Sequence, residues 1–300
     1  MTGRFGEFTI IKPLSPYLGR GSREVRSHHV IYKSGDLAIT AWLYLPPENY
    51  DGAPKGGHPL DLPAPKGGAI VAGHGGIWGV PSHYDNVLRR LAASGWTVAA
   101  PSYRGENGSD GKIEFALGEV DDTIACWKAL TSLDKIDPSR TWLLGSSHGA
   151  MVNLHLLARD DFPKEIPGAV SVSGVYDLTT WFIWMEETRH FLLEDPFFKR
   201  LLESGAEALE QRSVIYKADK IGKPIFLLHG QKDSMVPEEQ TWNLANELET
   251  AGNFAYKLRI DTGAEHEYIW APDRPGTDTT WSEILNFIES GGHIDEVEQE

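Results

Sequence analysis

Ser147 lies at the centre of the sequence GSSHG (residues 145–149), whose spacing is typical of a catalytic serine. A strand-like apolar run (141–144) precedes it and a helix-like run (150–157) follows. A serine on so sharp a turn has a strained backbone, which is tolerable only where glycines lie two residues away. Gly145 and Gly149 meet this need, and the helix directs its amide dipoles at charge developing on the serine. We therefore predict a nucleophile at Ser147; the alternative is a plain Gly/Ser-rich turn.

A serine hydroxyl reacts only when a base removes its proton and a carboxylate holds the resulting imidazolium. On the strand–turn–helix scaffold of such a serine, the acid follows a late strand and the histidine follows the last one. Asp233 comes after the apolar run 225–230, and His266 comes after the run 255–260. Each has an ordinary alternative, a turn-forming aspartate and an exposed loop histidine. Together with Ser147 they predict a Ser-His-Asp triad.

Other titratable residues near these positions are expected to have lesser roles. His229 lies within a predicted strand, so we expect a buried, hydrogen-bonded histidine. Glu265 and Glu267 flank His266 and are expected to point away from a ring directed at Ser147. For His148 the backbone N–H is expected to matter more than the ring, because the residue after the nucleophile supplies one oxyanion donor.

The second oxyanion donor is expected from the loop GHGGIWG (73–79), which follows the first buried strand. Glycines allow the backbone to come within hydrogen-bonding distance of a carbonyl oxygen, and one such amide contributes roughly 3–4 kcal/mol to transition-state binding. We predict that the donor is Gly75 or Gly76. Trp78 is a candidate wall of the substrate pocket, with ordinary packing as the alternative.

The elements that must position these residues alternate between strand and helix, which predicts an α/β protein with a mostly parallel central sheet and helices on both faces. Residues 29–32 and 37–45 are expected to form an antiparallel hairpin at the sheet edge, and 46–68 a surface loop. We divide the chain into an N-terminal surface arm (1–27), the catalytic domain (28–293) and an acidic tail (294–300). The expected strands are 69–72, 96–100, 141–145, 169–172, 225–229 and 255–260, and the expected helices are 84–94, 118–133, 238–250 and 280–290.

About fifty residues separate the strands at 169–172 and 225–229, where one helix would suffice. We predict a short helical lid over the active site at about 177–216. Its tryptophans, Trp181 and Trp184, are candidate substrate contacts. The alternative is that they dock the lid helices on the domain.

Composition excludes several classes of function. The formal net charge of −15 over 300 residues leaves no basic surface for nucleic acid. Cys126 is the single cysteine, so no intrachain disulfide is possible, and the histidines lack metal-site spacing. No cofactor motif and no membrane-spanning stretch is found, so we expect no metal, no cofactor, no membrane partner and a cytoplasmic location. A homo-oligomer remains possible.

Several short sequence motifs occur in the same order as in the catalytic domain of prolyl-oligopeptidase-type serine hydrolases of the α/β-hydrolase superfamily. Over roughly residues 30–290 the chain therefore resembles that domain. The resemblance implies an α/β-hydrolase fold, Ser147, Asp233 and His266 as the triad, and no cofactor. It rests on the stretches GHGG (73–76), SYRG (102–105), GEVDD (118–122), GSSHG (145–149), ADKI (218–221) and HGQKD (229–233) running on to Val236 and Pro237.

Two departures from that family bear on the substrate. Its peptidases carry a β-propeller ahead of the hydrolase domain, for which too few residues precede the pattern here. Several also have a tyrosine oxyanion donor where this chain has His74. Both favour a carboxylesterase for small or aromatic esters. The alternatives are an exopeptidase or amidase, with Glu186 and Glu187 as a possible amine anchor, and a non-catalytic ligand-binding protein.

Overall fold

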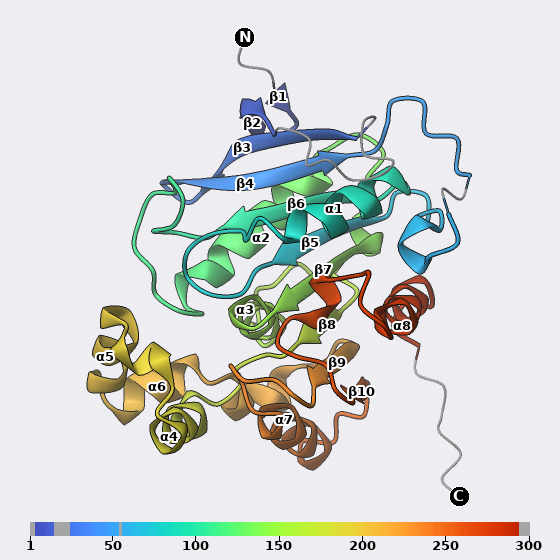
Figure 1. Ribbon diagram of the computed structural model, residues 1–300. Coiled ribbons are helices and arrows are strands. Elements are labelled where there is room, and N and C mark those ends of the chain that lie inside the picture. The colour runs from blue at the N-terminus through green and yellow to red at the C-terminus, as the bar shows by residue number, and fades with distance from the viewer. Residues whose placement is uncertain (1–3, 15–24, 54–55, 294–300) are drawn as a thin grey trace, which may run out of the picture.

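The computed structural model describes residues 4–14, 25–53 and 56–293, and within them one ten-stranded twisted sheet forms the centre of the molecule (Figure 1). The strand order is β1-β2-β3-β4-β6-β5-β7-β8-β9-β10. Strands β5 to β10 run parallel to one another, as predicted. Strands β1 to β4 pair antiparallel, and β4 also pairs antiparallel with β6. The strands are β1 (Arg4–Phe5), β2 (Phe8–Pro13), β3 (Arg26–Ser34), β4 (Leu37–Leu45), β5 (Ala69–Gly73), β6 (Thr97–Ser102), β7 (Thr141–Ser146), β8 (Ala169–Val172), β9 (Ile225–Gly230) and β10 (Tyr256–Asp261).

Helices cover both faces of this sheet, because successive side chains of the buried strands point to opposite sides. Ala69 and Val71 of β5 join the core beneath α2 (Gly118–Thr131), α3 (His148–Leu157) and α7 (Glu239–Thr250). Ile70 and Ala72 join the other core, beneath α1 (Tyr84–Ala93) and α8 (Thr277–Glu289). Every residue of β5 is buried, which explains its continuous apolar sequence.

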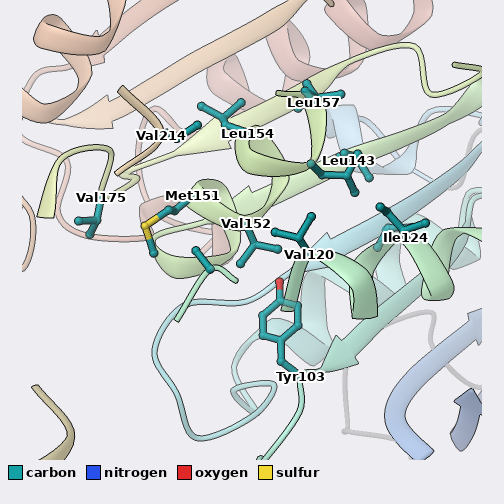
Figure 2. Packing of buried hydrophobic residues seen from close by; sticks show 14 of the residues in the cluster. Tyr103, Val120, Ile124, Leu143, Met151, Val152, Leu154, Leu157, Val175 and Val214 are labelled. Atoms are coloured by element: carbon teal, nitrogen blue, oxygen red, sulfur yellow. The ribbon is translucent and has the colours of Figure 1, made fainter. Parts of the chain in front are cut away.

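The helix that begins at the predicted nucleophile is packed on all sides. All ten residues of α3 are buried. Met151, Val152 and Leu154 of this helix lie among Val120 of α2 and Leu143 of β7 (Figure 2). This packing fixes the start of α3, and therefore the turn that precedes it, within the centre of the domain.

The N-terminal region differs from the prediction. Residues 4–13 were expected to lie in a surface arm, yet β1 and β2 extend the sheet, and Phe8 is fully buried against Tyr32. The hairpin of β3 and β4 is present, but β2 lies outside it, so the hairpin is not the edge. Only Phe8 of β2 is buried and the other residues are partly or fully exposed, so the strand lacks the alternating pattern that would mark it in the sequence. The rest of the predicted arm (1–3, 15–24) and the acidic tail (294–300) lie outside the described residues.

The segment between β8 and β9 is helical, as expected, and lies beside the carboxyl end of the sheet (Figure 1). It reaches a little beyond the predicted range of 177–216. Its function as a lid stays a prediction. The helices are α4 (Leu178–Thr188), η4 (Phe191–Glu194), α5 (Pro196–Glu203), α6 (Ala206–Arg212) and η5 (Val214–Lys220).

Candidate active site

The turn at Ser147 has the strained geometry that the sequence predicts, with φ 52° and ψ −117°. Few non-glycine residues adopt such a conformation, and a strained backbone of this kind is concentrated at functional sites. A Cβ on Gly145 would lie 2.4 Å from the carbonyl oxygen of Gly149, and one on Gly149 would lie 2.4 Å from the backbone of Gly73. Both glycines are therefore required for β7 and α3 to meet at this angle.

Asp233 and His266 are joined by a hydrogen bond of 2.7 Å between Oδ2 and Nδ1. The other oxygen of Asp233 accepts the backbone N–H groups of Met235 and Val236, each at 2.9 Å. Burial alone would raise the pKa of Asp233, but hydrogen bonds from His229 and His266 hold it well below its usual range. Asp233 is therefore a carboxylate at neutral pH that can orient the imidazole of His266.

The pKa of His266 is raised above its ordinary value. Burial lowers it, but the hydrogen bond and charge of Asp233 outweigh burial, and the charge of Glu267 adds to the effect. His229 is buried as expected, with Nδ1 2.7 Å from the hydroxyl of Thr241. Its Nε2 lies 3.0 Å from the Val236 carbonyl and 3.4 Å from Asp233 Oδ2. His229 therefore braces the loop that carries the acid, a role the sequence did not reveal.

The loop that carries His266 is tied to the turn at Ser147. Trp270 Nε1 donates a hydrogen bond of 2.7 Å to the hydroxyl of Ser146, the residue before the candidate nucleophile. Trp270 is also stacked on Tyr84 of α1 at a centroid distance of 3.8 Å. The carboxyl ends of β5, β7, β9 and β10 thus bring together the four segments that the sequence predicts to hold the site.

Hydrogen bonds fix the direction of each peptide in the glycine loop after β5. The carbonyl of His74 accepts from Gly149 N–H at 2.9 Å, and the N–H of the same peptide, on Gly75, is directed to the hydroxyl of Tyr84 at 3.3 Å. The carbonyl of Gly75 is held by its neighbour's ring nitrogen, His74 Nδ1, at 2.9 Å. Because a trans peptide directs its N–H opposite to its C=O, the Gly76 amide faces away from His74. Gly76 is thereby the freer of the two predicted donors.

His148 contributes both its backbone and its ring. Its amide belongs to the first residue of α3, where helical N–H groups have no partner within the helix. Its Nδ1 lies 2.9 Å from the carbonyl of Gly76, and burial lowers the pKa of this imidazole to about 4. A neutral ring with a proton on Nδ1 therefore holds the glycine loop in place. The ring of His148 thus has a role of its own beside the backbone N–H, which the sequence predicted to matter more.

His74 lies under the same loop, and its pKa is shifted in the opposite direction. Its Nε2 is 3.0 Å from Glu106 Oε2, and both side chains are fully buried. Burial lowers the pKa of His74, but the charge and hydrogen bond of Glu106 outweigh it, so the pKa is raised. An imidazolium can donate from both nitrogens, to Glu106 and to the Gly75 carbonyl. Glu106 carries no sequence signal, because its partner lies more than thirty residues earlier.

Glu267 lies in the site, contrary to the prediction that it points away. Its Oε1 accepts a 2.6 Å hydrogen bond from the Tyr84 hydroxyl. A Cβ placed on Gly75 would lie 2.0 Å from this oxygen and 3.1 Å from Ser147 Cβ. The reversal comes from the backbone of Glu267, which is left-handed at φ 54°. Glu265 does point outward, with 62% of its side chain exposed and an ion pair to Arg274.

The three tryptophans predicted to contact substrate have different surroundings. Trp181 is buried, and its Nε1 donates to the Met235 carbonyl at 2.9 Å, next to the acid loop. Trp184 is half-buried beside His190 at 5.5 Å. Trp78 is 61% exposed, and its ring lies 2.9 Å from where a Cβ on Gly76 would be. Trp181 therefore has the structural role of packing, while Trp78 remains open to a ligand.

Phe115 connects the helical insertion to the glycine loop and was not singled out in the sequence. Its ring is stacked on His148 at 4.5 Å and lies 5.5 Å from Phe198 of α5. Its backbone is left-handed, at φ 60°, and its N–H donates to the carboxylate of Glu119 at 3.0 Å. A phenylalanine in a polar loop has no periodic pattern that would mark it from sequence.

Neither a metal-binding cluster nor a membrane-spanning helix occurs in the part of the chain that the structure describes. Across residues 4–14, 25–53 and 56–293, no group of three or more histidine, cysteine, aspartate or glutamate side chains is arranged to hold a metal ion. Over the same ranges, no helix has the length and apolar character needed to cross a membrane.

The sequence pattern of the prolyl oligopeptidase family matches residues 82–290. The uncharacterized peptidase YtmA of Bacillus subtilis is 24% identical over 233 residues, which cover 76% of this chain and 81% of that protein. Acylamino-acid-releasing enzyme 1 of Oryza sativa is 26% identical over 242 residues, but this chain spans only 29% of its length.

Solved structures share the fold at low identity. The acylaminoacyl peptidase of Pyrococcus horikoshii superposes with a TM-score of 0.67 at 18% identity over 89% of this chain and 42% of that one. The esterase Pf2001 of Pyrococcus furiosus gives a TM-score of 0.65 at 20% identity over 93% of this chain and 98% of that one. The predicted α/β-hydrolase fold is confirmed.

Proposed function

The chain belongs to the prolyl oligopeptidase family of serine hydrolases, and we propose that it is a carboxylesterase acting on small or aromatic esters. The observation that carries the proposal is the hydrogen bond between Asp233 and His266 on a loop tied to the strained turn of Ser147. We propose these three residues as the catalytic triad. The amides of His148 and Gly76 form the oxyanion hole, with Gly75 bounding it.

In the proposed mechanism, His266 Nε2 takes the proton of Ser147 Oγ as this oxygen attacks the ester carbonyl carbon. The two amides bind the resulting oxyanion. As the tetrahedral intermediate collapses, His266 returns the proton to the alcohol oxygen, the C–O bond breaks and an acyl-enzyme remains. Water then gives a proton to His266 and attacks the acyl carbon, and Ser147 regains its proton as the acid leaves. Asp233 keeps the imidazole oriented and stabilises its cationic form.

Ester cleavage is supported by the likeness in fold to the esterase Pf2001. The second candidate, an exopeptidase or amidase, is favoured by the names of several relatives. Glu186 and Glu187, the candidate amine anchor, are both exposed near the end of α4. They are poorly suited to hold an amine close to Ser147.

The test compares p-nitrophenyl esters of increasing acyl length with aminoacyl p-nitroanilides, for wild type and Ser147→Ala. We expect kcat/KM to be highest on a short or aromatic ester and to fall by at least about 1000-fold in the variant. Ser139→Ala is the control, because it removes an exposed hydroxyl before the start of β7 and leaves both the nucleophile and the Ser146–Trp270 hydrogen bond. Anilide hydrolysis that exceeds ester hydrolysis would overturn the ester proposal in favour of the amidase, while equal activity in Ser147→Ala would overturn the serine assignment.

A further inference from the structure

Glu267 is a partly exposed carboxylate at the reacting centre that acyl transfer does not require. Its side chain is 14% exposed, and its Oε1 is occupied by the Tyr84 hydroxyl at 2.6 Å. Its Oε2 forms no hydrogen bond within the ranges that the structure describes. The nearest cationic candidate for Oε2 is His83 Nε2 at 3.9 Å, on a side chain that is 58% exposed. One oxygen is thus held in place, while the other remains accessible.

The backbone at Glu267 is strained to put the carboxylate there. Its φ of 54° is uncommon for a residue other than glycine. The Tyr84 ring that holds Oε1 is fully buried and stacked on Trp270. The carboxylate is therefore preorganised by buried aromatic side chains.

The position of Glu267 in the site indicates which part of a substrate it would meet. It directly follows His266, which must protonate the leaving alcohol, and its Oε1 abuts Gly75 next to Ser147. The carboxylate therefore lies close to Ser147, where it can meet a group attached to the reacting carbonyl. Trp78, beside the adjacent Gly76, offers an exposed indole face at the same loop. A carboxylate and an aromatic face together are the groups that bind substituted ammonium ions.

We propose that Glu267, with Trp78, determines specificity by binding a cationic group, an alkylammonium, on the alcohol portion of the ester. The inference rests on the proposed esterase function and names the substrate class for it. The acidic surface of the protein, with 43 acidic against 28 basic residues, would draw such a cation toward the site.

The test uses two esters of the same short acid, a choline ester and a 3,3-dimethylbutyl ester. Their alcohols have the same shape and differ only in the charge of the quaternary centre. The measured quantity is the ratio of kcat/KM for the charged ester to that for the neutral one. We expect a ratio of roughly 10 in wild type, as for a partly desolvated cation site. In Glu267→Gln, which keeps the shape and the hydrogen-bond acceptor, the ratio should fall to about 1.

Glu265→Gln is the matched control, since it removes the same charge on the other side of His266, where Glu265 is exposed and paired with Arg274. The ratio should stay at its wild-type value in this variant. A purely structural role for Glu267 would change both rates together and leave the ratio unchanged, and that result would overturn the inference alone. Absence of turnover of both esters would overturn the esterase proposal with it.

Discussion

The glycine loop after β5 and the loop that carries His266 reach Ser147 by different means. The glycine loop (73–79) is held from below by two buried imidazoles and a backbone hydrogen bond from Gly149. The histidine loop (261–271) is held by side chains from three distant elements, Asp233, Ser146 and Tyr84. The first region can serve as a rigid donor of hydrogen bonds, while the second must move protons and accept a leaving group.

The largest effect should come from removing the negative charge of Asp233, which holds the histidine loop through His266. Asp233→Asn keeps the shape but removes the charge that orients and stabilises the His266 imidazolium, so we expect kcat to fall by about 10³–10⁴. In wild type kcat/KM should rise with pH as His266 loses its proton, because the neutral imidazole is the active form. Since the pKa of His266 is raised, this increase should occur at higher pH than for an ordinary histidine. In the variant this rise should move to lower pH. A variant with unchanged kcat would mean that Asp233 is only a turn residue.

Gly75→Ala tests the contact between the two loops. The added methyl group would lie 2.0 Å from Glu267 Oε1 and 3.1 Å from Ser147 Cβ, so it must displace the Glu267 carboxylate and press on the side chain of Ser147. We expect kcat/KM to fall by about 100-fold, as for a displacement of about 1 Å at a reacting centre. Gly222→Ala is the control, because nothing lies within 4 Å of its Cβ position. Equal activity of both variants would show that the loops are not in contact.

The two imidazoles beneath the glycine loop should respond to pH with opposite signs. For His148 the folded-state pKa of about 4 lies below the unfolded value of 6.5, so stability is lost as pH falls from 6.5 toward 4. This loss is about 2 kcal/mol at pH 5. For His74 the pKa is raised, so its contribution is present below pH 6.5 and is lost as pH rises through the folded-state value.

Urea unfolding at pH 7 and pH 5 measures this difference. The free energy of unfolding should change less between these pH values in His148→Gln than in wild type, by about 2 kcal/mol. The contribution of His74 to the free energy of unfolding should be larger at pH 5 than at pH 7 in wild type, and this contribution should be absent in His74→Gln. His293→Gln, at an exposed position, should match wild type. Identical pH dependence in all four proteins would contradict the assigned charge states.

The smallest effect is expected at Glu106, which acts only through His74. Glu106→Gln removes the carboxylate that raises the pKa of His74, so His74 should be protonated to a smaller extent and the positive potential behind the glycine loop should weaken. We expect kcat to fall by about 10-fold with little change in KM. Glu48→Gln, at an exposed glutamate paired with Arg26, is the control. A loss confined to KM would contradict a role in transition-state binding.

The glycine loop and the turn at Ser147 could be predicted because each is encoded locally. GHGG and GSSHG carry the glycines that their close approaches require, and the strands beside them have continuous apolar sequences. The same locality allowed the order of strands and helices to be predicted from residue 29 onward. The short strand β2 was missed, because its pairing with β3 depends on a partner, not on its own pattern.

The histidine loop was predicted less completely because its contacts join residues far apart. The hydrogen bond of Tyr84 to Glu267 spans 183 positions, and that of Trp270 to Ser146 spans 124. No spacing rule relates such residues. The direction of Glu267 further depends on its left-handed backbone, which glutamate rarely adopts and which sequence patterns do not indicate.

The central claim is that Ser147 is the nucleophile which both loops serve. It is tested most directly by reaction with a fluorophosphonate probe, in which the serine oxygen displaces fluoride, followed by mass mapping of the adduct. We predict one adduct per chain, on the peptide that contains residues 145–149 and at Ser147, with labelling lost in Ser147→Ala and slowed in Asp233→Asn. An adduct on another residue, or equal labelling of Ser147→Ala, would contradict the account.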